Sequence, residues 1–156
     1  MMRQFLIIKW KKNLDILFLE KEYCQKENEK IENFYNEYEY ILIEIANIKE
    51  NKQFIKESDE IIIFVEPNLI GIKEIKDILE EIVIKQKNQK DKIKIVFNKK
   101  NILSIKPNIL KYLFEDFEII GTIQYDKYMD AFINSNTKFI PIKTKNAIEK
   151  IKNKII

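Results

Sequence analysis

Five short runs of apolar and β-branched residues constrain the fold most strongly, and three of them are apolar at nearly every position. The runs are "LDILFL" (14–19), "YILIEI" (40–45), "EIIIFV" (60–65), "KIKIVF" (92–97) and "FEIIGTI" (117–123). A strand with one face in water alternates apolar and polar residues, whereas a strand covered on both faces is apolar throughout. We therefore expect these segments to be strands of a mostly parallel sheet with helices on both faces.

Predicted helices lie between these predicted strands along the chain. Amphipathic spacing or a first-turn proline predicts helices at 69–84, 107–113, 126–133 and 145–155, and residues 24–38 are assigned to a helix by elimination. This alternation predicts a single α/β domain over residues 1–156.

Composition narrows the class of protein. With 156 residues and 46% hydrophobic content, the chain can bury the core of one domain. Its 28 basic and 25 acidic residues are interspersed, so the net charge of +3 predicts no specific nucleic-acid partner. Cys24 is the single cysteine, which fits a reducing, cytoplasmic environment. No apolar run approaches the roughly 20 residues of a transmembrane helix.

Several kinds of chemistry are excluded by the residues that the sequence lacks. The chain contains no histidine, which excludes Ser-His-Asp and Cys-His arrangements and histidine-based metal sites. Phosphate-binding loops need clustered glycines because the backbone must approach the phosphates closely. The two glycines, Gly71 and Gly121, are far apart in the sequence. We therefore predict no catalytic residue, no metal ligand and no P-loop.

Four segments carry a family resemblance when they are taken in order. They are "NEYEYILIEI", "SDEIIIFVEPNLIGIKEIKDIL", "KIKIVFNKKN" and "EIIGTIQYDKYMDAFINSN". Together they resemble the carboxyl-terminal half of the bacterial MinD/ParA family of P-loop ATPases, where the matching motifs are typically "YDYIIID", "SDEVIIVTEP", "VLNK" and "ILGVIPYD". The nearest branch is similar to the CpaE/TadZ-type proteins that position pilus machinery. The resemblance spans residues 13–143 and implies an incomplete P-loop NTPase fold.

The resemblance also implies five vestigial nucleotide-binding residues. Glu44 falls where the family has the Walker B aspartate that orders magnesium. Asn98 falls on the asparagine that reads adenine, although an asparagine here can instead cap a turn. Pro67 matches the "EP" corner, where a proline can also simply end a strand and open a helix. Gln124 replaces the proline of "IPYD", and Asp126 matches its aspartate.

The departures from the family pattern imply that ATP hydrolysis has been lost. The family's P-loop strand, glycine loop and first helix have no counterpart, and residues 1–12 are too few to supply them. Glu44 is one methylene longer than aspartate, and octahedral magnesium tolerates such displacement poorly. We therefore expect a degenerate, non-hydrolysing domain without a cofactor. It would act through protein contacts or self-association, in positioning pilus or secretion machinery.

Two alternatives remain open at this point. The chain can be one part of a split ATPase, which would bind ATP and magnesium only when another chain supplies the P-loop. It can also be a generic α/β protein-binding module, because a fold does not determine a function. Loss of the P-loop strand would open a slot in the sheet, which "RQFLIIKW" (3–10) or a second chain could fill.

Overall fold

The computed structural model describes residues 6–11, 14–18, 38–45, 48–49, 51–85, 90–129 and 140–155. The chain divides into two compact units, Met1–Phe54 and Ile55–Ile156, and the single domain expected over 1–156 stays a prediction. In the first unit, β1 (Leu6–Lys11) pairs antiparallel with β2 (Leu14–Phe18). Helix α2 (Lys52–Glu57) spans the division between the units. The helix expected over 24–38 lies outside the described residues, as does Cys24.

The second unit contains a three-stranded parallel sheet in the order β3-β4-β5. Its strands are β3 (Ile61–Val65), β4 (Ile93–Lys100) and β5 (Glu118–Gln124). The register aligns Ile63 with Ile95 and Ile95 with Ile119 across the three strands. The prediction of a parallel sheet with helices is therefore confirmed for three of the five predicted strands.

The helices of this unit follow the amphipathic segments closely. Helix α3 (Leu69–Glu80) continues as the π-helical turn η1 (Glu81–Lys85). It is followed along the chain by the 3₁₀ turn η2 (Lys90–Lys92), α4 (Pro107–Leu113) and α6 (Ile142–Lys152). The predictions for 69–84 and 107–113 are confirmed, and α6 begins before the predicted start at residue 145. Of the helix expected over 126–133, the structure describes helical residues 127–129, and positions from 130 lie outside the described part.

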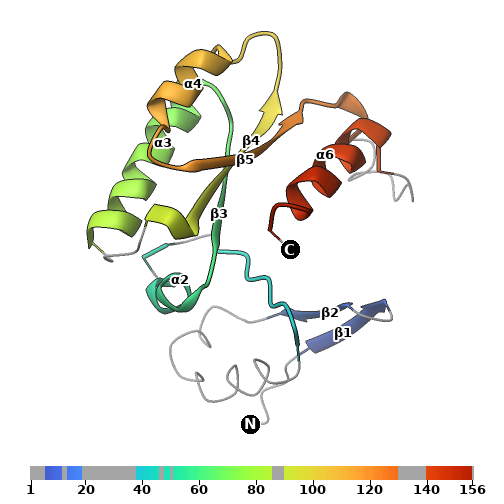
Figure 1. Ribbon diagram of the computed structural model, residues 1–156. Coiled ribbons are helices and arrows are strands. Elements are labelled where there is room, and N and C mark those ends of the chain that lie inside the picture. Colours follow the sequence, from blue (N-terminus) through green and yellow to red (C-terminus); the bar gives the residue numbers. More distant parts are fainter. Residues whose placement is uncertain are drawn as a thin grey trace. The chain divides into compact units, whose positions relative to one another are not determined.

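Strand β4 is the middle strand of the sheet, and helices cover both faces of that sheet (Figure 1). Figure 1 shows α3 and α4 on one side of the sheet and α6 on the other. On the first side, the Phe97 ring packs edge-to-face against Phe114, just after α4, with ring centroids 5.7 Å apart. On the opposite side, Val96 packs with Ile120 of β5 and Ile151 of α6. Neighbouring residues of β4 thus point into different layers, which is why the buried run Ile95–Phe97 is apolar at every position.

The predicted strand over 40–45 is wrong. Residues 38–45 have no regular secondary structure, and the Leu42 side chain is 87% exposed. High β-propensity reflects fit to a pleated, half-buried surface, so a β-rich run needs a partner strand and a covered face. The strand predicted over 14–19 does form, but as β2 of an antiparallel pair with β1, which occupies part of the 3–10 segment.

Gly121 permits α6 to lie directly on β5. A Cβ atom at this position would stand 2.3 Å from Cγ1 and 2.8 Å from Cδ1 of Ile151. Ile151 itself is buried in the cluster on that face of the sheet. Glycine is therefore needed here for close approach between a strand and a helix, and it is not part of a loop.

We expect Gly121→Ala to lower the free energy of unfolding by about 1–3 kcal/mol, because the added methyl overpacks the contact with Ile151. Ile151→Ala alone should cost about 2–5 kcal/mol through loss of buried surface. The double variant should cost less than the sum, because the shortened side chain makes room for the new methyl group. Urea denaturation of the four proteins measures the coupling, and strict additivity would contradict the packing described here.

Candidate functional site

The carboxyl ends of β3, β4 and β5 meet at one edge of the sheet, because the three strands are parallel. Open α/β proteins bind their ligands at this edge, in the crevice outside the strand ends. The polar residues that the structure places here are Glu66 and Asn68 after β3, Asn98 and Lys99 near the end of β4, and Gln124 and Asp126 at the end of β5. This edge is the candidate site.

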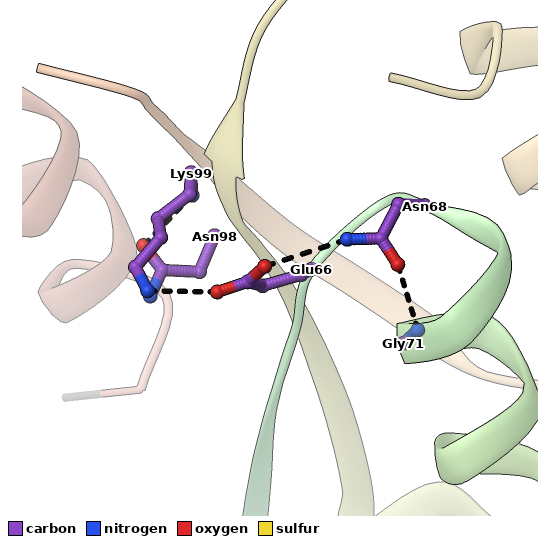
Figure 2. A network of polar contacts seen from close by, with 5 residues as sticks. All are labelled: Glu66, Asn68, Gly71, Asn98 and Lys99. Atoms are coloured by element: carbon purple, nitrogen blue, oxygen red, sulfur yellow. Dashed lines mark hydrogen bonds and ion pairs between the residues drawn. The ribbon is translucent and has the colours of Figure 1, made fainter. Parts of the chain in front are cut away.

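A short polar network joins the end of β3 to the end of β4 (Figure 2). Lys99 Nζ donates a hydrogen bond to Glu66 Oε1 at 2.7 Å, and Asn68 Nδ2 donates to Glu66 Oε2 at 3.4 Å. The Lys99 and Glu66 side chains are 60% and 46% exposed, so their ion pair contributes little to stability. Both carboxylate oxygens of Glu66 therefore have hydrogen-bond partners from the protein itself.

After β3, the chain turns at Pro67 and Asn68 and enters helix α3. Pro67 is fully buried, and its carbonyl oxygen accepts the Ile105 N–H at 2.8 Å. Asn68 then caps α3 in an extended conformation, with its Oδ1 accepting the Gly71 N–H at 2.8 Å. The contacts of Pro67 thus match the alternative of a proline that ends a strand and opens a helix.

Gly71 is required by the same corner. A Cβ atom at this position would stand 2.3 Å from the backbone oxygen of Glu66. The first turn of α3 therefore packs directly on the chain that leaves β3, and only a residue without a side chain fits there.

Strand β4 ends in an unusual backbone conformation. Lys99 has a φ of 53°, in the left-handed region, where a residue with a Cβ atom is strained. The strand register shifts between Phe97 and Lys100 along the pairing with β5, which marks an irregularity of the β-bulge type. The Asn98 Oδ1 atom accepts the Lys99 N–H at 2.9 Å and so supports the turn itself. Lys99 is a residue that the sequence reasoning missed, because no motif marks a left-handed lysine.

The residues after β5 also make local contacts. The Tyr125 N–H donates to the Lys100 carbonyl at 2.8 Å, which continues the pairing of β5 with β4 past Gln124. Asp126 Oδ1 accepts the Tyr128 N–H at 3.0 Å and starts the helical residues 127–129. Gln124 is exposed as the last residue of β5. Asp126 therefore acts as a turn cap here.

The structure thus brings Pro67, Asn98, Gln124 and Asp126 to one edge of the second unit. Glu44 belongs to the first unit, where it is exposed in the irregular segment 38–45 and does not end a strand. Within the described residues, no group of three or more histidine, cysteine, aspartate and glutamate side chains could hold a metal ion. Among the helices of that same part of the chain, none is long and apolar enough to cross a membrane.

Comparison with known proteins identifies no relative. No family model, no curated protein and no solved structure matches this chain.

We expect Asn68→Ala to lower the free energy of unfolding by about 1 kcal/mol, because the Gly71 N–H loses its side-chain cap. Asn68→Ser is the matched control, since its hydroxyl can cap the same N–H without placing a second carboxylate beside Glu66. Chemical denaturation of both variants measures the difference. Equal stabilities for the alanine and serine variants would contradict the capping role.

We expect Lys99→Gly to be more stable than Lys99→Ala by about 1 kcal/mol, because glycine adopts the left-handed conformation without the Cβ clash. Both variants remove the Nζ atom and therefore the ion pair with Glu66, so their difference isolates the backbone cost. Thermal and urea denaturation report it. An alanine variant as stable as the glycine variant would show that the backbone at Lys99 is unstrained.

Proposed function

We propose that this chain is a degenerate MinD/ParA-like domain that does not hydrolyse ATP and acts through protein contacts. The process that the four-segment resemblance suggests is the positioning of pilus or secretion machinery. The observation that carries the proposal is the placement of the two glycines, because a P-loop ATPase cannot work without glycines in its phosphate-binding loop.

Both glycines of the chain have packing roles. Gly71 lies in the first turn of α3 against the Glu66 carbonyl, and Gly121 lies within β5 against Ile151. Neither has a positive φ, and neither belongs to a loop between a strand and a helix. The sequence contains no others. The chain by itself therefore has no glycine with which to build a loop that wraps phosphates.

The ion pair of Lys99 also opposes phosphate binding at that lysine. Strand β4 ends in Lys99 and Lys100, and the Nζ of Lys99 is paired with the Glu66 carboxylate. A phosphate that approached Lys99 would have to displace Glu66 or lie beside its negative charge, which is unfavourable at close range. The Lys99–Glu66 pair presents a positive and a negative charge side by side. Such a pair suits contact with the mixed charges of another protein surface.

The arrangement of the strands supports the family assignment in the proposal. Three of the four segments that resemble the family form adjacent parallel strands in chain order, and their polar ends lie at one edge, whereas the first segment, with Glu44, forms no strand over the described residues 38–45. The resemblance implies this clustering of Pro67, Asn98, Gln124 and Asp126. A sheet that scattered these residues over both edges would have argued against it.

Isothermal titration of the full chain with Mg-ATP tests the proposal. We expect no saturable heat at micromolar ligand and no release of phosphate over the no-protein blank. Asn98→Ala is the matched control, because any residual adenine recognition through Asn98 would disappear in it while stacking or non-specific heat would remain. Micromolar binding with turnover by the wild-type chain would contradict the proposal.

A further inference from the structure

The connection between β4 and α4 holds the most exposed apolar pair of the described chain. In Figure 1 it is the amber loop that leaves the upper end of β4 and returns into α4. Ile102 is 98% exposed and Leu103 is 88% exposed. Both occupy the centre of a tight turn, from Asn101 to Ser104, where polar residues, glycine and proline are the usual choice.

The turn provides partners for most of its own backbone N–H groups. The Ser104 N–H donates to the Asn101 carbonyl at 3.2 Å, and the Leu103 N–H donates to Asn101 Oδ1 at 2.8 Å. The Asn101 N–H donates to Ser104 Oγ at 2.9 Å. A segment that enters an apolar medium must satisfy its polar backbone groups internally, and this turn largely does so.

A second exposed apolar pair lies next to the turn. The Ile105 N–H donates to the Pro67 carbonyl at 2.8 Å, which anchors the connection to the corner where α3 begins. Leu69 and Ile70, in the first turn of α3, are both largely exposed. We call Leu69, Ile70, Ile102 and Leu103 the apolar edge. Exposed apolar groups gathered in this way mark a contact surface for a protein or a membrane.

Lysines and an aromatic ring border the turn. Lys99 and Lys100 precede it and Lys106 follows it, while Tyr125 is held beside Lys100 through the bond to the Lys100 carbonyl. At the turn itself, Lys100 and Lys106 add to the Lys99–Glu66 pair and leave a positive balance of charge, whereas Leu69 and Ile70 line a hollow together with Lys73, Glu74 and Asp77. An apolar tip with flanking lysines suits the boundary between lipid headgroups and acyl chains.

We propose that the apolar edge docks on an anionic lipid surface, with Ile102 and Leu103 inserted below the headgroups and Lys100 and Lys106 among them. A bilayer fits this projecting turn better than a protein does, because it accepts a convex apolar tip without a preformed pocket. The positive charge around the turn selects acidic lipids by complementarity. This inference goes beyond the proposed function and does not depend on whether the chain binds nucleotide.

Vesicle co-sedimentation of the full chain tests the inference. The probe is phosphatidylcholine vesicles with and without phosphatidylserine. We expect binding to the serine-containing vesicles, falling as salt is raised. The Ile102→Ser/Leu103→Ser double variant should lose about tenfold or more in vesicle affinity, because the inserted apolar area is removed without a change of charge. Ile84→Ser is the matched control, since Ile84 is 68% exposed on η1, and it should bind as the wild type does.

Lys100→Gln/Lys106→Gln tests the electrostatic part separately. It should weaken binding to serine-containing vesicles and flatten the salt dependence, while its folding, checked by circular dichroism, stays intact. The lipid assignment is overturned if the wild type ignores anionic vesicles, or if the serine double variant binds them equally well. A wild-type chain that self-associates through the turn without binding vesicles, as seen by sedimentation velocity, would make the apolar edge a protein contact and would also overturn it.

Discussion

The described structure of the second unit depends on the burial of β4 from both sides. Phe97 faces the α4 layer and Val96 faces the α6 layer, so the buried run Ile95–Phe97 is apolar at successive positions. Parallel pairing with β3 and β5 then brings three strand ends to a single edge. The polar groups of the candidate site owe their positions to this burial, because the strands carry the corners that hold Glu66, Asn98 and Asp126.

The contacts at that edge are mostly internal to the protein. Asn68 caps α3, Asn98 supports the turn at Lys99, and Asp126 caps the turn after β5. These three polar side chains are thus occupied in holding their own loops together. Meanwhile the loop residues between them carry exposed apolar side chains, above all Ile102 and Leu103. These two facts together describe an edge suited to surface contact.

Sequence patterns predicted the second unit well because its elements are long, periodic and buried. The apolar runs at 60–65 and 92–97 and the proline-led helix at 107–113 each carried enough local signal. The run at 40–45 has an equally high β-propensity but forms no strand. Strand formation also needs a partner strand, which the composition of a segment does not reveal. The pairing of β1 with β2 was missed for the same reason.

The candidate site was only partly predictable. The family resemblance named five residues, of which Pro67, Asn98, Gln124 and Asp126 lie at the ends of parallel strands, whereas Glu44 does not end a strand. The left-handed backbone of Lys99 and its ion pair with Glu66 could not be predicted from the sequence, because they arise from a register shift between two strands. The functions of the two glycines also became clear only from the atoms that surround them.

Amide NMR spectra of the nitrogen-labelled full chain test the central claim most directly, namely that this edge is a contact surface and holds no nucleotide. Separate titrations with Mg-ATP and with anionic bicelles report on the same residues. The account predicts that Ile102 and Leu103 shift with bicelles while Asn98, Gln124 and Asp126 do not move with Mg-ATP. Saturable shifts of Asn98, Gln124 and Asp126 with Mg-ATP, and none at the turn with bicelles, would contradict it.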